Sequence, residues 1–222
     1  MFKPEKFFDL SNFEYKDIFN NIEKVWEIIP YLPDFALKIL KTIPKEKRIQ
    51  GEVKNGAILI GDEIFIARGA KIEPTAYIEG PAIIGPNSIV GTAAYVRGGT
   101  ILGKNCILGH CTESRNTLML DGSKAPHFNF IGDSILGNNV NIGAGVILAN
   151  LRLDSKNVPV GKENSGLQKF GAILGDRVKI GCNTVTEPGT LLAKDCWVFP
   201  CIYLRRGLYK KGRRKIDLIK KL

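Results

Sequence analysis

An aliphatic residue returns every six positions through the middle of the chain, and this repeat constrains the fold more than any other feature. The first run comprises Ile60, Ile66, Ile72, Ile78, Ile84, Val90, Val96, Leu102 and Leu108. A small residue often stands two positions earlier, and glycine or asparagine often follows, which suits left-handed turns. One strand and one turn per six residues predict a solenoid in which three hexads close each triangular coil.

The repeat changes phase twice, and each break predicts a loop that leaves the coil. After Leu120 the aliphatic series resumes at Phe130, and after Leu148 it resumes at Leu174. We expect loops over residues 121–127 and 155–169. Loops on a rigid scaffold commonly carry function.

Residues 1–50 follow a different pattern. Ser11 and Glu14 have the spacing of a capping box, and apolar residues then recur at helical spacing as far as Ile29. Prolines end this helix, and a second helix is expected over residues 33–42. We predict a helical pair that covers the N-terminal end of the β-helix, where strand edges would otherwise be open.

The chain therefore divides into a helical cap (1–50), a repeat domain (51–204) and a basic tail (205–222). The 32 basic and 22 acidic residues give a net charge of +10. The tail has nine basic residues against Asp217 alone, which gives it +8 of that charge. A tail of this kind is either solvated or binds nucleic acid, anionic lipid or a phosphorylated ligand.

No apolar run approaches the roughly 20 residues of a membrane span, and the first residues lack the apolar core of a secretion signal. We therefore expect a cytoplasmic protein with no membrane span. The five cysteines (106, 111, 182, 196 and 201) contain no C-x-x-C pair. We expect them to be reduced, buried small residues.

A metal site is not expected. Two histidines are too few for a three-histidine zinc site. Cys106, His110 and Cys111 are close in sequence, but Cys106 falls at an inward-facing small position of the repeat and no fourth ligand is evident.

The repeat resembles that of the hexapeptide-repeat acyltransferases, whose fold is a left-handed parallel β-helix and most of which are trimers. Within it, Ser-Lys-Ala-Pro-His (123–127), Ile-Gly-Asp (131–133) and Asn-Val-Asn-Ile-Gly-Ala-Gly (139–145) resemble the acetyltransferase domain of bacterial bifunctional GlmU. The resemblance runs from about residue 96 to residue 184 with one long insertion. It implies a homotrimer, with an active site between two β-helices, that transfers acetyl from acetyl-CoA to glucosamine 1-phosphate.

The resemblance also implies roles for particular residues. His127 corresponds to the general base toward the sugar amine, a role that imidazole suits because it titrates near neutral pH. Glu113 corresponds to a glutamate that steadies this base. The residues that correspond to its phosphate-binding side chains are Arg97, Arg115 and Lys169, and three cations are what a phosphate site requires.

Further positions follow from the same resemblance. Asn141 and Asn150 correspond to asparagines that contact the sugar and its amine. Phe130 stands where the family has a substrate-contacting tyrosine, and Cys182 stands where it has a serine near acetyl-CoA. Arg205 and Arg206 of the tail could reach the phosphates of coenzyme A.

Three functions are therefore open. The leading one is a stand-alone amino-sugar N-acetyltransferase, and the departures at Phe130 and Cys182 bear on its acceptor more than on the reaction type. A non-catalytic trimeric scaffold or sugar-nucleotide-binding protein is the alternative. Nucleic-acid binding by the tail is less favoured, because only Tyr203 and Tyr209 could stack on bases. No glycine-rich nucleotide loop is present, so pyrophosphorylase activity is not expected.

Overall fold

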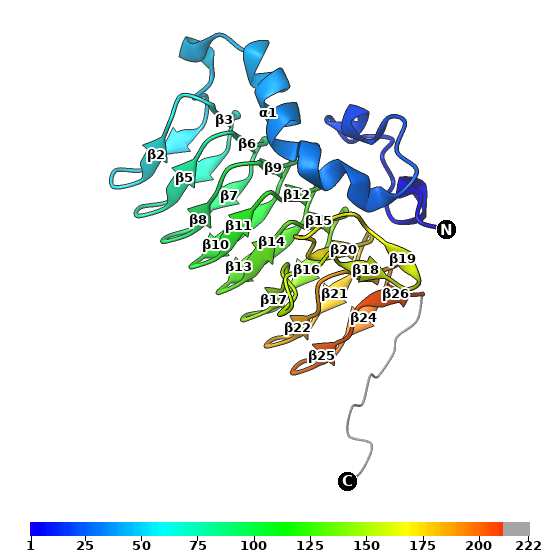
Figure 1. Ribbon diagram of the computed structural model, residues 1–222. Coiled ribbons are helices and arrows are strands. Elements are labelled where there is room, and N and C mark those ends of the chain that lie inside the picture. Colours follow the sequence, from blue (N-terminus) through cyan, green and yellow to red (C-terminus); the bar gives the residue numbers. More distant parts are fainter. Residues whose placement is uncertain (211–222) are drawn as a thin grey trace.

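The computed structural model describes residues 1–210, which form a triangular β-helix with a helical segment along one side (Figure 1). Three eight-stranded parallel sheets make the sides of the triangle, and the fold is the predicted left-handed parallel β-helix. No helix within residues 1–210 combines the length and apolarity needed to cross a bilayer. The predicted basic tail lies mostly outside the described residues.

Each coil contributes one short strand to each sheet. The first sheet contains β1 (Glu52–Val53), β4 (Lys71–Ile72), β7 (Ile89–Val90), β10 (Ile107–His110), β13 (Lys124–His127), β16 (Asn141–Ile142), β21 (Lys179–Ile180) and β24 (Trp197–Val198). The second sheet contains β2 (Ile58–Ile60), β5 (Tyr77–Glu79), β8 (Tyr95–Val96), β11 (Glu113–Arg115), β14 (Phe130–Gly132), β17 (Ile147–Leu148), β22 (Val185–Thr186) and β25 (Tyr203–Leu204). The third sheet contains β3 (Ile64–Ile66), β6 (Ala82–Ile84), β9 (Thr100–Leu102), β12 (Leu118–Met119), β15 (Ile135–Leu136), β20 (Ala172–Leu174), β23 (Thr190–Leu192) and β26 (Gly207–Tyr209).

The aliphatic residues of the hexads stack inside the coil, as predicted. Ile72, Val90 and Leu108 are fully buried on successive strands of the first sheet, and Ile78 and Val96 are equally buried in the second. Burying one such side chain contributes about 1.5–3 kcal/mol, so the stacked column stabilises the solenoid.

The number of residues per coil varies. This variation, rather than a loop, explains the first phase change of the repeat. Ile89 pairs with Ile107, a step of 18 residues, whereas Ile107 pairs with Lys124 after a step of 17. The phase change after Leu120 is therefore spread over several shortened coils. Residues 124–127 form strand β13 rather than a loop, so the prediction of a loop over 121–127 is wrong.

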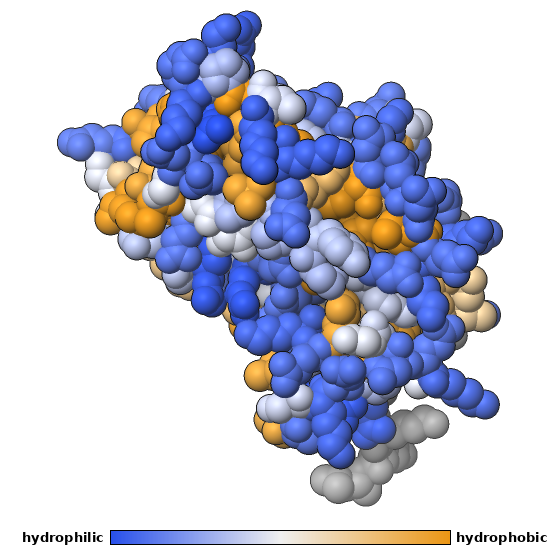
Figure 2. Space-filling view, turned by 45° about the horizontal axis from the view of Figure 1, so that its top comes forward, coloured by the Kyte–Doolittle hydropathy of each residue, from blue (hydrophilic) through white to orange (hydrophobic). Residues whose placement is uncertain are grey.

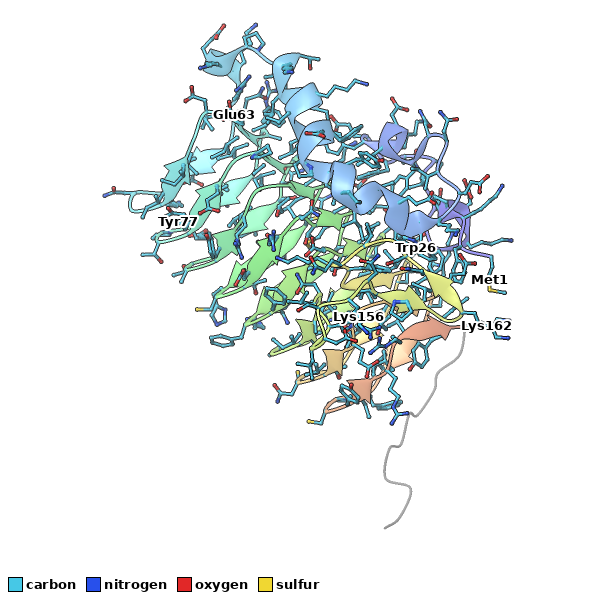
Figure 3. The ribbon with its side chains drawn as sticks, in the orientation of Figure 1. Met1, Trp26, Glu63, Tyr77, Lys156 and Lys162 are labelled. Atoms are coloured by element: carbon cyan, nitrogen blue, oxygen red, sulfur yellow. The ribbon has the colours of Figure 1, made fainter. Side chains whose placement is uncertain are left out.

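The second predicted loop is confirmed. Ile135 of β15 pairs with Ile173 of β20, a step of 38 residues, so about one extra coil length of chain leaves the solenoid. This insertion contains an antiparallel hairpin of β18 (Pro159–Val160) and β19 (Glu163–Asn164). Lys156 and Lys162 on the insertion are labelled in Figure 3.

The N-terminal segment contains one α-helix, α1 (Leu32–Lys41), which confirms the second predicted helix. The other helices are short 3₁₀ turns: η1 (Pro4–Lys6), η2 (Lys16–Phe19), η3 (Val25–Tyr31) and η4 (Lys45–Lys47). The predicted continuous helix as far as Ile29 is wrong, because Asn21 adopts a left-handed conformation (φ 61°) between η2 and η3. The predicted capping box does not form either, since Ser11 donates its hydrogen bonds to Asp9.

The same segment lies along the outer face of the third sheet, not over the end of the β-helix as predicted (Figure 1). The outward residues of that sheet are themselves apolar: Ile83, Ile101, Leu118, Ile135, Ile173 and Leu191 are all fully buried. Trp26, labelled in Figure 3, packs against Phe170 with ring centroids 5.9 Å apart. A sheet that is apolar on both faces needs a covering layer, and residues 1–42 supply it.

Two smaller predictions also need correction. The β-helix continues past residue 204, because β26 pairs with β23 in the third sheet. All five cysteines are free, but Cys111, Cys182 and Cys201 are exposed rather than buried. On the face drawn in Figure 2, hydrophilic residues predominate and apolar residues form separate patches.

Candidate functional site

The corner between the first and second sheets carries both histidines. His127 ends β13, and the chain then turns through Phe128, which has a φ of 51°, toward the second sheet. The buried Asn129 fixes this turn: its side chain accepts a hydrogen bond from the His127 backbone N–H (3.2 Å) and donates one to the Gly143 carbonyl (2.7 Å). The turn leaves the imidazole of His127 exposed.

The side-chain partner of His127 is His110. The two residues pair in register across β10 and β13, and their Nδ1 atoms are 3.0 Å apart. Glu113, predicted to steady the base, instead accepts a hydrogen bond from Arg97 (3.1 Å). Because Glu113 lies on the outer face of the second sheet beside that arginine, this chain does not join Glu113 to His127 by a hydrogen bond.

Two of the three predicted phosphate-binding cations are neighbours. Arg97 follows β8 and Arg115 ends β11. The pairing of Val96 with Ser114 places the two arginines at the ends of neighbouring strands, which lie about 4.8 Å apart in a sheet. Lys169 is exposed and forms an antiparallel bridge with Leu151. It therefore lies at the same edge of the second sheet, but two strands beyond Arg115.

Asn150 belongs to a buried polar network at that edge. Its Nδ2 donates to Asp133 Oδ2 (2.6 Å), while Asn116 Nδ2 donates to Asp133 Oδ1 (3.0 Å). Asp133 is 4% exposed, so these hydrogen bonds offset the cost of burying its polar side chain. A Cβ on Gly132 would lie 2.5 Å from Asn150 Nδ2, so the network requires glycine there. Since the amide nitrogen of Asn150 is committed to Asp133, its oxygen is the free acceptor.

The remaining predicted substrate residues lie on both sides of the histidine corner. Phe130 pairs with Glu113 on the second sheet. Asn141 is on the first sheet between Lys124 and Lys179, so the corner separates it from the arginines. Cys182 lies in the same corner as His127, two coils further on, and is exposed.

The two arginines predicted to bind coenzyme A differ. Arg206 Nε donates to Glu187 Oε2 (2.9 Å), and the Tyr203 hydroxyl donates to the other oxygen of this carboxylate. Burial raises the pKa of Glu187, but the hydrogen bonds from Tyr203 and Arg206 outweigh it and lower this pKa to about 2. Arg205 is exposed, and it has no ion pair within residues 1–210.

An open groove of about 410 Å³ adjoins these residues. The insertion after β17 overhangs the second sheet here, and the lining includes Ala149, Leu151, Leu153, Val185, Tyr203 and Arg206. The Leu153 side chain is fully exposed. Asn150 stands in the chain between Ala149 and Leu151, two residues that line the groove.

His110 and Asp133 belong to the candidate site but were not predicted from the sequence. Both stand 17 residues from a predicted site residue, His110 before His127 and Asp133 before Asn150. The signal was therefore the length of the shortened coils, which a fixed period of six obscures.

No cluster of three or more His, Cys, Asp or Glu side chains in residues 1–210 is arranged to hold a metal ion. Cys106 points into the coil, where burial raises the pKa of its thiol to about 12. His110 and Cys111 lie on the outside of the corner, so the three residues do not converge.

Comparisons with known proteins identify related chains. The family model described as the GMPPB C-terminal domain matches residues 78–192. A bifunctional sugar-1-phosphate nucleotidylyltransferase/acetyltransferase of Sulfurisphaera tokodaii is 34% identical over 88% of this chain and 48% of its own length. A bifunctional protein GlmU of Methanococcus maripaludis is 36% identical over 91% of this chain and 50% of its own length. The chain thus spans about half the length of these relatives.

Solved structures are more distant. The UDP-N-acetylglucosamine acyltransferase of Arabidopsis is 12% identical, with a TM-score of 0.39 over 74% of this chain and 70% of that one.

Proposed function

The chain belongs to the family of the GMPPB C-terminal domain, and on that premise we propose that it is an acetyl-CoA-dependent N-acetyltransferase of an amino-sugar phosphate such as glucosamine 1-phosphate. The observation that carries the proposal is the exposed imidazole of His127 at a corner whose adjoining face holds Arg97 and Arg115. A base at the corner and a pair of arginines on the adjoining face suit an acceptor that carries an amine and a phosphate.

In the proposed reaction, His127 Nε2 takes a proton from the neutral acceptor amine as its nitrogen attacks the thioester carbonyl. A C–N bond forms, and the tetrahedral oxyanion requires a donor N–H. When the intermediate collapses the C–S bond breaks, and the proton held by His127 passes to the departing thiolate of coenzyme A. Arg97 and Arg115 would bind the phosphate and set the position of the amine.

Asn150 and the groove suit the binding of acetyl-CoA, the acetyl donor. The free amide oxygen of Asn150 can accept an N–H from the acceptor amine or from the pantetheine arm of acetyl-CoA. The apolar wall of the groove suits that arm, and the exposed Arg205 would meet the phosphates of coenzyme A.

The proposal includes a homotrimer with the site between two chains. Phe128, Leu153 and Tyr203 are 56%, 108% and 51% exposed along this corner and groove. Apolar side chains at that exposure are typical of a surface that another chain covers. A second chain would also close the open side of the groove and exclude water from the thioester.

The phosphate assignment is tested with Arg115→Ala. Loss of a charge-assisted hydrogen bond of about 1.5–3 kcal/mol raises the KM for the amino-sugar phosphate roughly 10- to 100-fold, with little change in the KM for acetyl-CoA. Arg177→Ala is the matched control, because Arg177 pairs with Asp195 in a different corner of the coil. Equal acceptor KM values in the two variants would remove Arg115 from the phosphate site.

A non-catalytic protein that binds a sugar nucleotide, or a scaffold, is the second candidate. It is favoured by Phe130, which has no hydroxyl to offer a substrate, and by Cys182 in place of a serine. Thermal unfolding separates the two, because a ligand at 100 times its Kd stabilises the folded state by about 2.7 kcal/mol. A rise in Tm with acetyl-CoA supports the enzyme, and a rise with sugar nucleotides alone supports the alternative.

A further inference from the structure

The two histidines of this chain form a pair that leaves a single proton in their shared hydrogen bond. His110 and His127 end adjacent strands, their Nδ1 atoms are 3.0 Å apart, and their ring centroids are 4.9 Å apart. At that separation one Nδ1 carries a hydrogen and the other accepts it.

The surrounding backbone holds the pair in place. A Cβ on Gly109 would lie 1.8 Å from the carbonyl oxygen of Pro126, so β10 approaches β13 this closely only with glycine before His110. On its other side, the ring of His110 packs edge-on against Phe128, with centroids 4.5 Å apart. The orientation of His110 is therefore set from both sides.

The direction of the shared hydrogen bond decides what His127 can do. If His110 donates, the proton of a neutral His127 is on Nε2, and that atom cannot accept another. If His127 donates, its Nε2 has a free lone pair directed away from His110. Only the second arrangement gives a general base.

We infer that His110 is the positioning residue of this site: its Nδ1 accepts the Nδ1–H of His127 and so keeps His127 Nε2 free to take the proton of the acceptor amine. The inference rests on the proposed acetyl transfer. It gives His110 the part that resemblance assigned to Glu113, whose carboxylate is bonded to Arg97. The group that accepts the hydrogen bond from His127 is then a neutral imidazole rather than a charged carboxylate.

The test reads the tautomer of His127 directly by ¹⁵N–¹H long-range NMR correlation on the full chain, in which only two imidazoles give signals. In the wild type, His127 shows the Nδ1–H tautomer. In His110→Ala it changes to the Nε2–H form that free histidine prefers. In His110→Asn the amide oxygen occupies the place of Nδ1 and restores the Nδ1–H form.

Kinetics provide the second measurement. His110→Ala lowers kcat roughly 10- to 100-fold with little effect on either KM, and His110→Asn recovers most of the loss. Cys111→Ser, at the next and exposed position, is the control that keeps the wild-type rate.

The two measurements separate this inference from the proposed function. A wild-type chain that acetylates no amino-sugar phosphate overturns the function, whereas the NMR signals still report whether His110 sets the tautomer. An Nε2–H form of His127 in the wild type, or an unchanged tautomer in His110→Ala, overturns the role of His110 whatever the activity.

Discussion

Asp133 shows at the scale of one residue how the site and the fold depend on each other. Its two carboxylate oxygens accept from Asn116 and Asn150, so Asp133→Asn leaves one of these amides without its acceptor. We expect a loss of about 1–3 kcal/mol in the free energy of unfolding and reduced acetyl transfer, because the pair of acceptors that positions Asn116 and Asn150 is lost. Urea unfolding and steady-state kinetics measure the two effects.

The matched control for Asp133 is Asp62→Asn. Asp62 pairs with Lys45 on the surface, where both side chains are about two-thirds exposed or more, so the expected cost is under about 1 kcal/mol. Equal destabilisation by the two substitutions would contradict the account of the buried network.

Glu187 makes a prediction about pH. Its folded-state pKa of about 2 lies below its ordinary value of 4.5, so its contribution to stability is complete above pH 4.5 and disappears as the pH falls toward 2. That contribution is at most about 3 kcal/mol. Glu187→Gln should flatten the dependence of the urea midpoint on pH between 4.5 and 2. Glu46→Gln, at an exposed carboxylate, should leave the dependence unchanged.

At the scale of elements, the N-terminal segment is part of the packed core. Trp26 is 1% exposed and contacts Phe2 and Phe170, so Trp26→Ala should cost about 3–5 kcal/mol. Tyr31→Ala, at an aromatic side chain that is 60% exposed, should cost less than about 1 kcal/mol. Thermal or urea unfolding of both variants checks this. Similar losses would mean that the segment is held to the third sheet by something other than its buried face.

Elements that depend on a local sequence pattern were predicted well, and elements that depend on single residues or on distant partners were not. The coil was predictable because the hexads require only that one residue in six be buried. Helix α1 was predictable because a proline marks its start. The break at Asn21 depends on a single left-handed residue, and the docking of Trp26 depends on partners more than a hundred positions away. The apolar outer face of the third sheet was visible in runs such as Ala-Ile-Leu at residues 172–174, where alternation is absent.

Prediction of the site was limited in the same way. The resemblance predicted roles for His127, Arg97 and Arg115, and the coil places the two arginines at the ends of neighbouring strands. His110 contacts His127, and Asp133 contacts Asn150, because one coil is 17 residues long at these positions. A strict period of six predicts coils of 18 residues and so does not predict these contacts.

At the scale of the whole molecule, the proposed trimer should be required for activity. Leu153→Asp places a charge on the exposed side chain that overhangs the groove, with no effect expected on the fold of one chain. We expect a lower apparent mass by light scattering and a fall in acetyl transfer, because the partner no longer covers the groove. A variant that is monomeric and fully active would contradict a site shared between chains.

The most direct test of the central claim is to detect the products of acetyl transfer. Wild type and His127→Ala are incubated with acetyl-CoA and glucosamine 1-phosphate, and coenzyme A and the N-acetylated sugar are quantified by mass spectrometry. A thiol reagent is avoided because Cys111, Cys182 and Cys201 are exposed. The account predicts both products in equal amounts from the wild type and a rate about 10²- to 10⁴-fold lower from a folded variant that still binds acetyl-CoA. Equal rates from the two proteins, or no N-acetylated sugar from a wild type that binds acetyl-CoA, would contradict it.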